Sequence, residues 1–265
     1  MKKILLNILK VAAGLYIAMC ILLYIFQEKL IFFPHKLKKD HTFQFVQEFE
    51  ELNIKTQDGT SINGLLFRAD SSKGLIFYLH GNAGSLDGWG KVAETYTGMQ
   101  YDVFIFDYRG FGKSEGQING QEQIFRDNQA VYDELKKRYS KDKIIVLGYS
   151  IGTGLAAKIA AENNPRMLIL QAPYYSMTDI MEHRYPFVPT GLLRYTFATN
   201  MYLKACNMPM YIFHGNTDGV IYHGSSLKLK DELKERVTLI TLNGQGHNGM
   251  TDNPDYRAEL RRILK

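Results

Sequence analysis

Two patterns of hydrophobic and polar positions divide the chain near residue 50. From Ile4 to Phe26 the residues are apolar except for Asn7 and Lys10. Beyond residue 50, short apolar runs alternate with amphipathic segments. Such alternation is typical of βαβ units in a mainly parallel sheet that is flanked by helices. The pattern therefore predicts an α/β domain preceded by one long apolar helix.

The predicted sheet begins with a hairpin and continues with buried strands. Glu51–Thr56 and Ser61–Ala69 flank an Asp-Gly turn, which favours a hairpin. The later runs are apolar throughout, as expected for strands covered on both faces. We expect these strands at Leu75–Leu79, Val103–Phe106, Ile144–Leu147, Leu168–Leu170, Met210–Phe213 and Val237–Leu242. Helical spacing of apolar residues predicts helices at Gln121–Tyr139, Thr153–Asn163, Ser225–Arg236 and Asp255–Leu264.

One stretch interrupts this alternation. Residues 173–205 are rich in Tyr, Phe, Met and Pro, with Pro186 and Pro189 near the middle. We expect a helical lid insertion over the upper edge of the sheet. Its apolar side chains either line an acyl-binding pocket or pack as ordinary core, and both interpretations are open at this point. The side chains concerned are Tyr174, Tyr175, Met177, Met181, Tyr185, Phe187, Leu192, Leu193, Tyr195 and Phe197.

The N-terminal apolar run has the length of a membrane-spanning helix. About 20 apolar residues cross the hydrocarbon of a bilayer at ~1.5 Å per residue, and Lys10 lies close enough to one end to snorkel. A cleaved signal peptide needs a small-x-small site after the run, and Tyr24–Glu28 contains none. A helix packed on a soluble domain would have a polar face, whereas this run is apolar all round. We therefore predict an uncleaved single-pass membrane anchor that contacts membrane lipids.

The excess of basic residues lies beside this predicted anchor. Residues 1–40 carry seven lysines and two acidic residues, and thus the whole formal net charge of +5. The rest of the chain is balanced, so we expect no nucleic-acid-binding face. Lysines flank both ends of the apolar run, which leaves the side of the membrane open. We divide the chain into residues 1–40, an anchor with a basic juxtamembrane segment, and residues 41–265, a catalytic domain with 173–205 as its lid.

The strongest chemical motif is a serine between glycines. Gly148-Tyr149-Ser150-Ile151-Gly152 follows a predicted strand and precedes a predicted helix, which is the context of a G-x-S-x-G nucleophile elbow. The glycines permit the close backbone approach of a sharp turn, and the helix N-terminus directs N–H groups toward a developing oxyanion. We therefore predict that Ser150 is a catalytic nucleophile.

A serine hydroxyl needs a general base, and in this context the order along the chain is serine, acid, histidine. Of the histidines after Ser150, His247 lies in a glycine-rich loop that follows the last predicted strand. His183 lies in the insertion, His214 ends a strand and is interpreted as a structural turn residue, and His223 precedes the last strand. His247 is therefore the predicted base.

The predicted acid is Asp218, four residues beyond His214 at the end of a strand. A carboxylate there can accept the imidazole N–H of His247 and hold the productive tautomer. Asp179 in the insertion and Asp231 on a predicted helix are interpreted as solvated charges.

The oxyanion formed during acyl transfer needs two N–H donors. One is expected from the backbone of Ile151, directly after the nucleophile, and the other from Asn82 in the loop after the strand Leu75–Leu79. His80, just before that loop, is interpreted as a hydrogen-bonding support of the turn. The only cysteines, Cys20 and Cys206, form no disulfide framework or zinc site, and no metal or organic cofactor is implied.

Together these motifs resemble the α/β-hydrolase superfamily over roughly residues 50–265, and most closely its membrane-anchored, single-pass abhydrolase-type branch of serine hydrolases. That resemblance implies scaffold roles for Asp107 and Arg109, and Ile221-Tyr222 departs from it because many relatives carry a proline there. The strings that carry it are Gly148–Gly152, His80–Gly84, Asp107–Gly116 and Gly246–Asn248.

The predicted activity is hydrolysis of a carboxylic ester or thioester, with acyl lipids as candidate substrates, through Ser150, His247 and Asp218. Two alternatives are open. One is a serine peptidase or amidase with the same triad. The other is a non-catalytic membrane-anchored binding protein on a hydrolase scaffold, which would be expected to lack a triad member, whereas all three are present.

Overall fold

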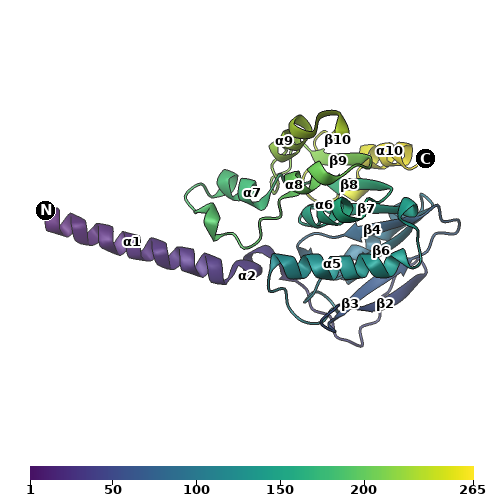
Figure 1. The fold of residues 1–265 in the computed structure, drawn as a ribbon, viewed down its shortest axis with the longest axis horizontal. Coiled ribbons are helices and arrows are strands. Elements are labelled where there is room, and N and C mark those ends of the chain that lie inside the picture. The colour runs from purple at the N-terminus through teal and green to yellow at the C-terminus, as the bar shows by residue number, and fades with distance from the viewer.

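The N-terminal apolar run forms one helix, α1 (Lys2–Ile25), which projects from the rest of the chain (Figure 1). The computed structural model describes residues 1–265. None of the 24 residues of α1 is buried, so this helix does not belong to the core of the domain. At ~1.5 Å per residue it is about 36 Å long, enough to cross the hydrocarbon of a bilayer.

The remaining chain forms an eight-stranded sheet in the order β10-β9-β8-β7-β4-β6-β3-β2. The pairs from β10 to β6 are parallel, and β3 alone runs against its neighbours. The strands are β2 (Phe49–Lys55), β3 (Ser61–Phe67), β4 (Leu75–Leu79), β6 (Asp102–Phe106), β7 (Ile144–Tyr149), β8 (Met167–Gln171), β9 (Met210–Gly215) and β10 (Val237–Leu242).

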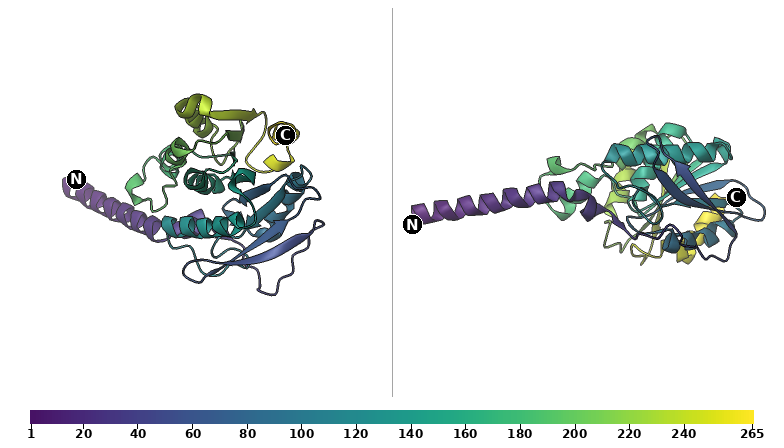
Figure 2. Two further views of the ribbon diagram at one scale, coloured as in Figure 1. Left: turned by 45° about the vertical axis from the view of Figure 1, so that its right-hand side comes forward. Right: turned by 90° about the horizontal axis from the view of Figure 1, so that it is seen from below.

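Helices cover both faces of this sheet (Figures 1 and 2). Successive residues of β7 alternate between two apolar clusters, because neighbouring side chains of a strand point to opposite faces. One cluster is closed by α5 (Gln121–Lys136), α6 (Gly152–Asn163), α8 (Thr199–Ala205) and α9 (Gly224–Leu233). The other is closed by α3 (Leu86–Trp89), α4 (Ala93–Thr97) and α10 (Pro254–Ile263).

The predicted mainly parallel sheet with flanking helices is confirmed, and the differences are local. The predicted helix ends at Tyr139 and Arg236 are too late, since α5 ends at Lys136 and α9 gives way to a 3-10 turn. Helices α3 and α4 were not predicted, because they are too short to show a helical period. The 3-10 turns are η1 (Gly90–Val92), η2 (Lys141–Lys143), η3 (Thr190–Leu192), η4 (Lys234–Arg236) and η5 (Met250–Asp252).

The segment after α1 packs closely onto the domain. A short helix, α2 (Gln27–Ile31), buries Gln27 and Ile31. The following strand β1 (Phe33–Pro34) pairs in parallel with β5 (Ala83–Gly84), in the loop after β4. The base of α1 is therefore held against the edge of the sheet where its parallel strands end.

The insertion contains α7 (Met177–Arg184), the turn η3 and α8. Its apolar residues divide between the two interpretations left open by the sequence. Tyr174, Tyr195 and Phe197 are fully buried core residues. Met177, Met181, Tyr185, Leu192 and Leu193 instead line a groove of about 360 Å³.

A buried ion pair links the loop after β6 to α5. Arg109 donates to both carboxylate oxygens of Asp127 at 2.7 Å, and both side chains are 5% exposed. Arg109 also pairs with Asp58 at 2.8 Å, but that carboxylate is 56% exposed. The Asp127 pair is shielded from water and the Asp58 pair is not. Breaking the Asp127 pair should therefore lower the free energy of unfolding more than breaking the Asp58 pair.

We expect Arg109→Met to lower the free energy of unfolding by about 3–5 kcal/mol, because it leaves Asp127 buried without a partner. The double variant Arg109→Met/Asp127→Leu should recover a large part of that loss. Asp58→Asn, the matched control at the exposed partner, should cost no more than about 1 kcal/mol. Denaturant unfolding of the four proteins checks this, and an Asp58→Asn cost equal to that of Arg109→Met would contradict it.

Candidate active site

Ser150 lies at a sharp turn between β7 and α6, with a φ of 54° in the left-handed region. A non-glycine residue adopts this conformation at a cost, so the surroundings must hold it. Its N–H donates to the carbonyl of Gln171 on β8 at 2.9 Å. Its carbonyl accepts from the N–H of Thr153 at 2.9 Å and from the Thr153 hydroxyl at 2.6 Å. Strand, turn and helix are thus joined around the serine.

The turn also depends on the absence of side chains at its glycines. A Cβ on Gly148 would lie 2.4 Å from the carbonyl oxygen of Gly152, and one on Gly152 would lie 2.1 Å from that of Leu79. A Cβ on Gly154 would lie 2.1 Å from the Tyr174 hydroxyl. Because the first two contacts are with backbone, neither clash can be relieved by rotating a side chain. Both glycines are therefore required for β7, α6 and β4 to meet at Ser150.

The structure brings Ser150, His247 and Asp218 into one hydrogen-bonded row. His247 Nε2 lies 3.0 Å from Ser150 Oγ, and His247 Nδ1 lies 2.7 Å from Asp218 Oδ2. Ser150 is 7% and Asp218 8% exposed, and the His247 side chain is 10% exposed. In a neutral imidazole one ring nitrogen donates and the other accepts. Donation from Nδ1 to Asp218 leaves Nε2 to accept the proton of Ser150.

Asp218 is held by more than His247. Its Oδ1 accepts the N–H groups of Val220 at 2.8 Å and Ile221 at 2.9 Å, and His214 Nε2 lies 3.3 Å from Oδ2. Burial raises the pKa of the Asp218 carboxyl, but hydrogen bonds from His214 and His247 outweigh it and hold this pKa well below its usual range. Asp218 is therefore an ionised acceptor at neutral pH.

Two supporting side chains were not identified from the sequence. His214, interpreted there as a turn residue, is fully buried, with Nδ1 2.6 Å from the Ser226 hydroxyl and its other nitrogen facing Asp218. Tyr149 donates its hydroxyl to the carbonyl of His247 and so fixes the histidine loop. The only sequence signals were that Tyr149 directly precedes Ser150 and that His214 lies four residues before Asp218.

The interpretation of Asp179 as a solvated charge is wrong. Asp179 is 9% exposed, and its carboxylate accepts from Tyr222 at 2.6 Å and pairs with Lys228. Asp179 therefore links α7 of the insertion to α9. These contacts join residues more than 40 positions apart, so no local sequence pattern indicates them. Asp231 is exposed, as expected.

The two predicted oxyanion donors have free N–H groups. Neither the Asn82 nor the Ile151 backbone N–H donates a hydrogen bond within the protein. Asn82 is fixed in other ways, since its carbonyl accepts from Phe33 at 2.8 Å and its side chain donates to the Ile31 carbonyl at 3.1 Å. The segment that follows α1 thus supports the loop that is predicted to hold the oxyanion.

His80 is fully buried before that loop, and its Nδ1 lies 2.7 Å from the Gly81 carbonyl oxygen. Burial lowers the pKa of His80 to about 4, so its imidazole is neutral at pH 7 and donates from Nδ1 to Gly81. This agrees with its interpretation as a support of the turn. As for metals, no group of three or more His, Cys, Asp or Glu side chains in the chain is placed to hold an ion.

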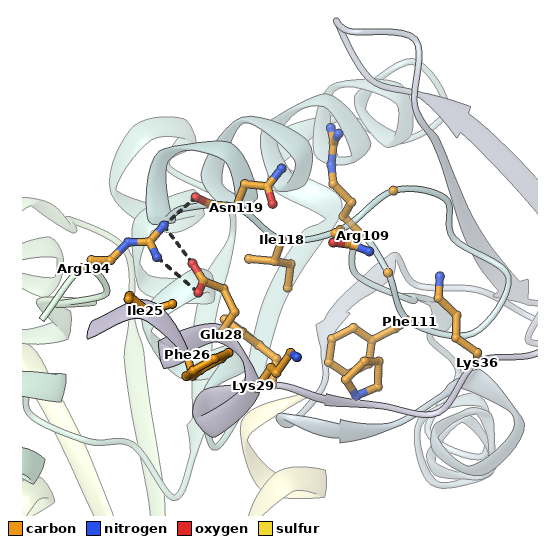
Figure 3. A pocket seen from close by; sticks show the side chains of 15 residues that line it. Ile25, Phe26, Glu28, Lys29, Lys36, Arg109, Phe111, Ile118, Asn119 and Arg194 are labelled. Carbon is orange, nitrogen blue, oxygen red and sulfur yellow. Dashed lines mark hydrogen bonds and ion pairs between the residues drawn. The ribbon is translucent and has the colours of Figure 1, made fainter. Parts of the chain in front are cut away.

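Two hollows lie where α1 meets the domain. The apolar groove of about 360 Å³ lies between the end of α1, α2 and the insertion, and ten of its eleven lining residues are hydrophobic. Its wall residue Ile31 is the one whose carbonyl holds Asn82. The second hollow, of about 510 Å³, is more polar, and in it Arg194 is joined to Glu28 and Asn119 (Figure 3). Neither includes a member of the Ser150 row.

Comparison with known structures identifies this architecture. The esterase Pf2001 of Pyrococcus furiosus superposes with a TM-score of 0.72 at 19% identity, covering 88% of this chain and 96% of the esterase. A Xanthomonas campestris protein described as an α/β serine hydrolase without lid gives a TM-score of 0.60 at 16% identity, over 84% and 94% of the two chains. The chain therefore has the α/β-hydrolase fold.

Sequence comparisons agree with this fold. Residues 70–196 match the profile of a family described as serine aminopeptidase, S33. An uncharacterized protein of Mycobacterium tuberculosis is 25% identical over 245 residues, covering 90% of this chain and 87% of its own. Protein bem46 of Schizosaccharomyces pombe is 27% identical over 238 residues, covering 81% and 79%.

The glycine requirement at the Ser150 turn is testable. Gly152→Ala should destabilise the protein by about 1–3 kcal/mol or prevent folding, because the added methyl meets the Leu79 carbonyl. Gly88→Ala is the matched control, since a Cβ there meets nothing within 4 Å. Thermal unfolding of both variants checks this. Equal melting temperatures for the two would show that the turn tolerates a side chain.

Asp218→Asn should lower stability in a pH-dependent way. The ionised carboxylate stabilises the folded state above its unfolded pKa of about 4, and this contribution is lost as the pH falls through the lower folded-state pKa. The difference in unfolding free energy between wild type and variant should therefore be larger near pH 6 than near pH 3. Denaturant titrations at several pH values measure it, and a difference that grew toward acid would contradict the assignment.

Proposed function

We propose that the protein is a serine hydrolase that cleaves carboxylic ester or thioester bonds of acyl lipids through an acyl-enzyme on Ser150. The observation that carries this proposal is the row Ser150–His247–Asp218, with distances of 3.0 and 2.7 Å, at a strained elbow. A buried serine next to an accepting imidazole nitrogen is an activated nucleophile. The α/β-hydrolase fold provides the setting in which such an elbow performs acyl transfer.

Acylation follows from this geometry. Ser150 Oγ attacks the acyl carbonyl carbon while its proton moves to His247 Nε2, and Asp218 stabilises the imidazolium through Nδ1. The carbonyl oxygen becomes an oxyanion that accepts from the free N–H groups of Asn82 and Ile151. Collapse of this intermediate breaks the bond to the leaving alkoxide or thiolate, which takes the proton from His247.

Deacylation repeats the sequence with water. His247, neutral again, removes a proton from a water molecule that attacks the acyl-enzyme carbonyl. The same two N–H groups receive the second oxyanion. Return of the proton from His247 to Ser150 Oγ releases the carboxylic acid and restores the enzyme.

The apolar groove favours acyl chains as the substrate class. Its walls are formed by Met177, Ile180 and Met181 of α7 on one side and by residues near the end of α1 on the other. Methionine side chains adapt to flexible apolar ligands. Its wall residue Ile31 accepts a hydrogen bond from the Asn82 side chain, so the groove borders the loop that we propose to hold the oxyanion.

We further propose that α1 anchors the enzyme in a membrane. The helix is apolar, long enough to span a bilayer and entirely unburied. An uncleaved anchor is supported by the residues that follow it. Gln27, Ile31 and Phe32 are buried in the catalytic domain, and Phe33 is bonded to the Asn82 loop, so the junction is part of the folded site.

The second candidate function is that of a serine peptidase or amidase, favoured by the match to the serine aminopeptidase family. Both candidates use the same acyl-enzyme. Nitrophenyl esters of increasing chain length and aminoacyl amides, assayed side by side, separate them. The proposal expects turnover of the esters, faster for longer acyl chains, and it fails if the amides alone are hydrolysed.

Ser150→Ala should abolish ester hydrolysis and labelling by a fluorophosphonate probe, because the nucleophile is removed. Loss of the serine in a comparable triad costs roughly a million-fold in kcat. Ser71→Ala, at an exposed serine, is the matched control and should keep full activity and labelling. Labelling of folded Ser150→Ala protein equal to wild type would refute the assignment, and absence of wild-type labelling would favour the non-catalytic binding protein.

A further inference from the structure

The insertion contains an uncharged segment with exposed apolar side chains. Nine residues, Tyr185–Leu193, lie between Arg184 and Arg194 without a charge. Phe187 is 85% exposed and Tyr185 62% exposed. Large aromatic side chains exposed together mark a surface that something apolar covers.

This segment lies against the apolar helix α1. The Tyr16 hydroxyl donates to the Phe187 carbonyl at 2.7 Å, and η3 packs against α1. Gln27 extends the contact, since its side chain donates to the Leu192 carbonyl at 2.9 Å and accepts from the Arg194 N–H at 2.7 Å. Figures 1 and 2 show the insertion beside the part of α1 nearest the domain.

The contact at Tyr16 shows how far the segment extends along α1, measured from the end of the helix nearest the domain. Tyr16 lies nine residues before the end of α1 at Ile25, or about 14 Å at 1.5 Å per residue. Half the hydrocarbon thickness of a bilayer is about 15 Å. At the domain end of α1, charged groups begin with Glu28, which pairs with Arg194 at 2.9 Å (Figure 3). A bilayer that surrounds α1 and leaves this ion pair at its surface therefore also surrounds Phe187.

We propose that Tyr185–Leu193 is embedded in the acyl-chain region of a phospholipid bilayer beside α1, as a second membrane-inserted element. This rests on the proposed anchoring of α1. The two arginines at its ends would then lie at headgroup level, where their charge is stable. The groove, lined by Tyr185, Val188, Leu192 and Leu193 of the segment and by Leu23 of α1, would face the lipid leaflet.

Part of the backbone of the segment has its polar groups satisfied, as burial in hydrocarbon requires. Unpaired backbone groups are costly there. Pro186 and Pro189 have no N–H, and the N–H groups of Val188, Leu192 and Leu193 donate within the segment. Tyr16 and Gln27 satisfy two of its carbonyls. Phe187, Thr190 and Gly191 keep free N–H groups.

Quenching of tryptophan fluorescence by brominated lipid tests this in the full-length protein. Phe187→Trp, Ile17→Trp and Val46→Trp are each reconstituted into phosphatidylcholine vesicles, with or without bromine at the middle of one acyl chain. All three positions are exposed, so the variants should fold. Wild-type protein, with Trp89 as its only tryptophan, supplies the background.

We expect the added emission of Phe187→Trp to be quenched as strongly as that of Ile17→Trp, which lies next to Tyr16, while Val46→Trp is unaffected. Quenching of Ile17→Trp without quenching of Phe187→Trp would overturn the inference and leave the anchor intact. A blue-shifted but unquenched Phe187→Trp would overturn it in favour of a protein partner. An unquenched Ile17→Trp would refute the anchor and the inference together, without bearing on Ser150 hydrolysis.

Discussion

The strained turn at Ser150 is the constraint on which the rest of the site depends. Its left-handed backbone exists only because β4, β7 and α6 approach one another over glycines, with backbone oxygens where side chains would otherwise be. The same approach leaves the N–H of Ile151 free at the start of a helix. The position of the Ser150 hydroxyl beside His247 and the free N–H of Ile151 are therefore two consequences of one packing arrangement.

Asp218 is held by several contacts outside the Ser150 row, and the His247 loop by one. Asp218 is fixed by two backbone N–H groups and by His214 below it, and the His247 loop by the Tyr149 hydroxyl. Such redundancy matters because a base displaced by 1 Å loses much of its effect. Pre-organisation of this kind lowers the cost of reaching the transition state, since little has to move during the reaction.

The N-terminal segment links the location of the protein to its chemistry. Residues directly after α1 are buried in the domain and bonded to the Asn82 loop, and the insertion contacts α1 on the other side. The proposed anchor, acyl groove and oxyanion donor thus form one continuous structure. Under the proposed function, the hydrolase acts where the apolar chains of its substrates are concentrated.

The sequence alone determined the features that have local patterns. Buried parallel strands, the hairpin and the order Ser150, Asp218, His247 follow from periodicity and from motifs with steric requirements, and the fold they indicate is confirmed. The tertiary structure alone decided the roles of His214 and Tyr149, the burial of Asp179 and the contact of Tyr16 with Phe187. The contacts of Tyr149, Asp179 and Tyr16 join residues 43 to 171 positions apart. His214 contacts Asp218 from a fully buried position. Such pairings leave no trace in local sequence, because they are set by how the elements pack together.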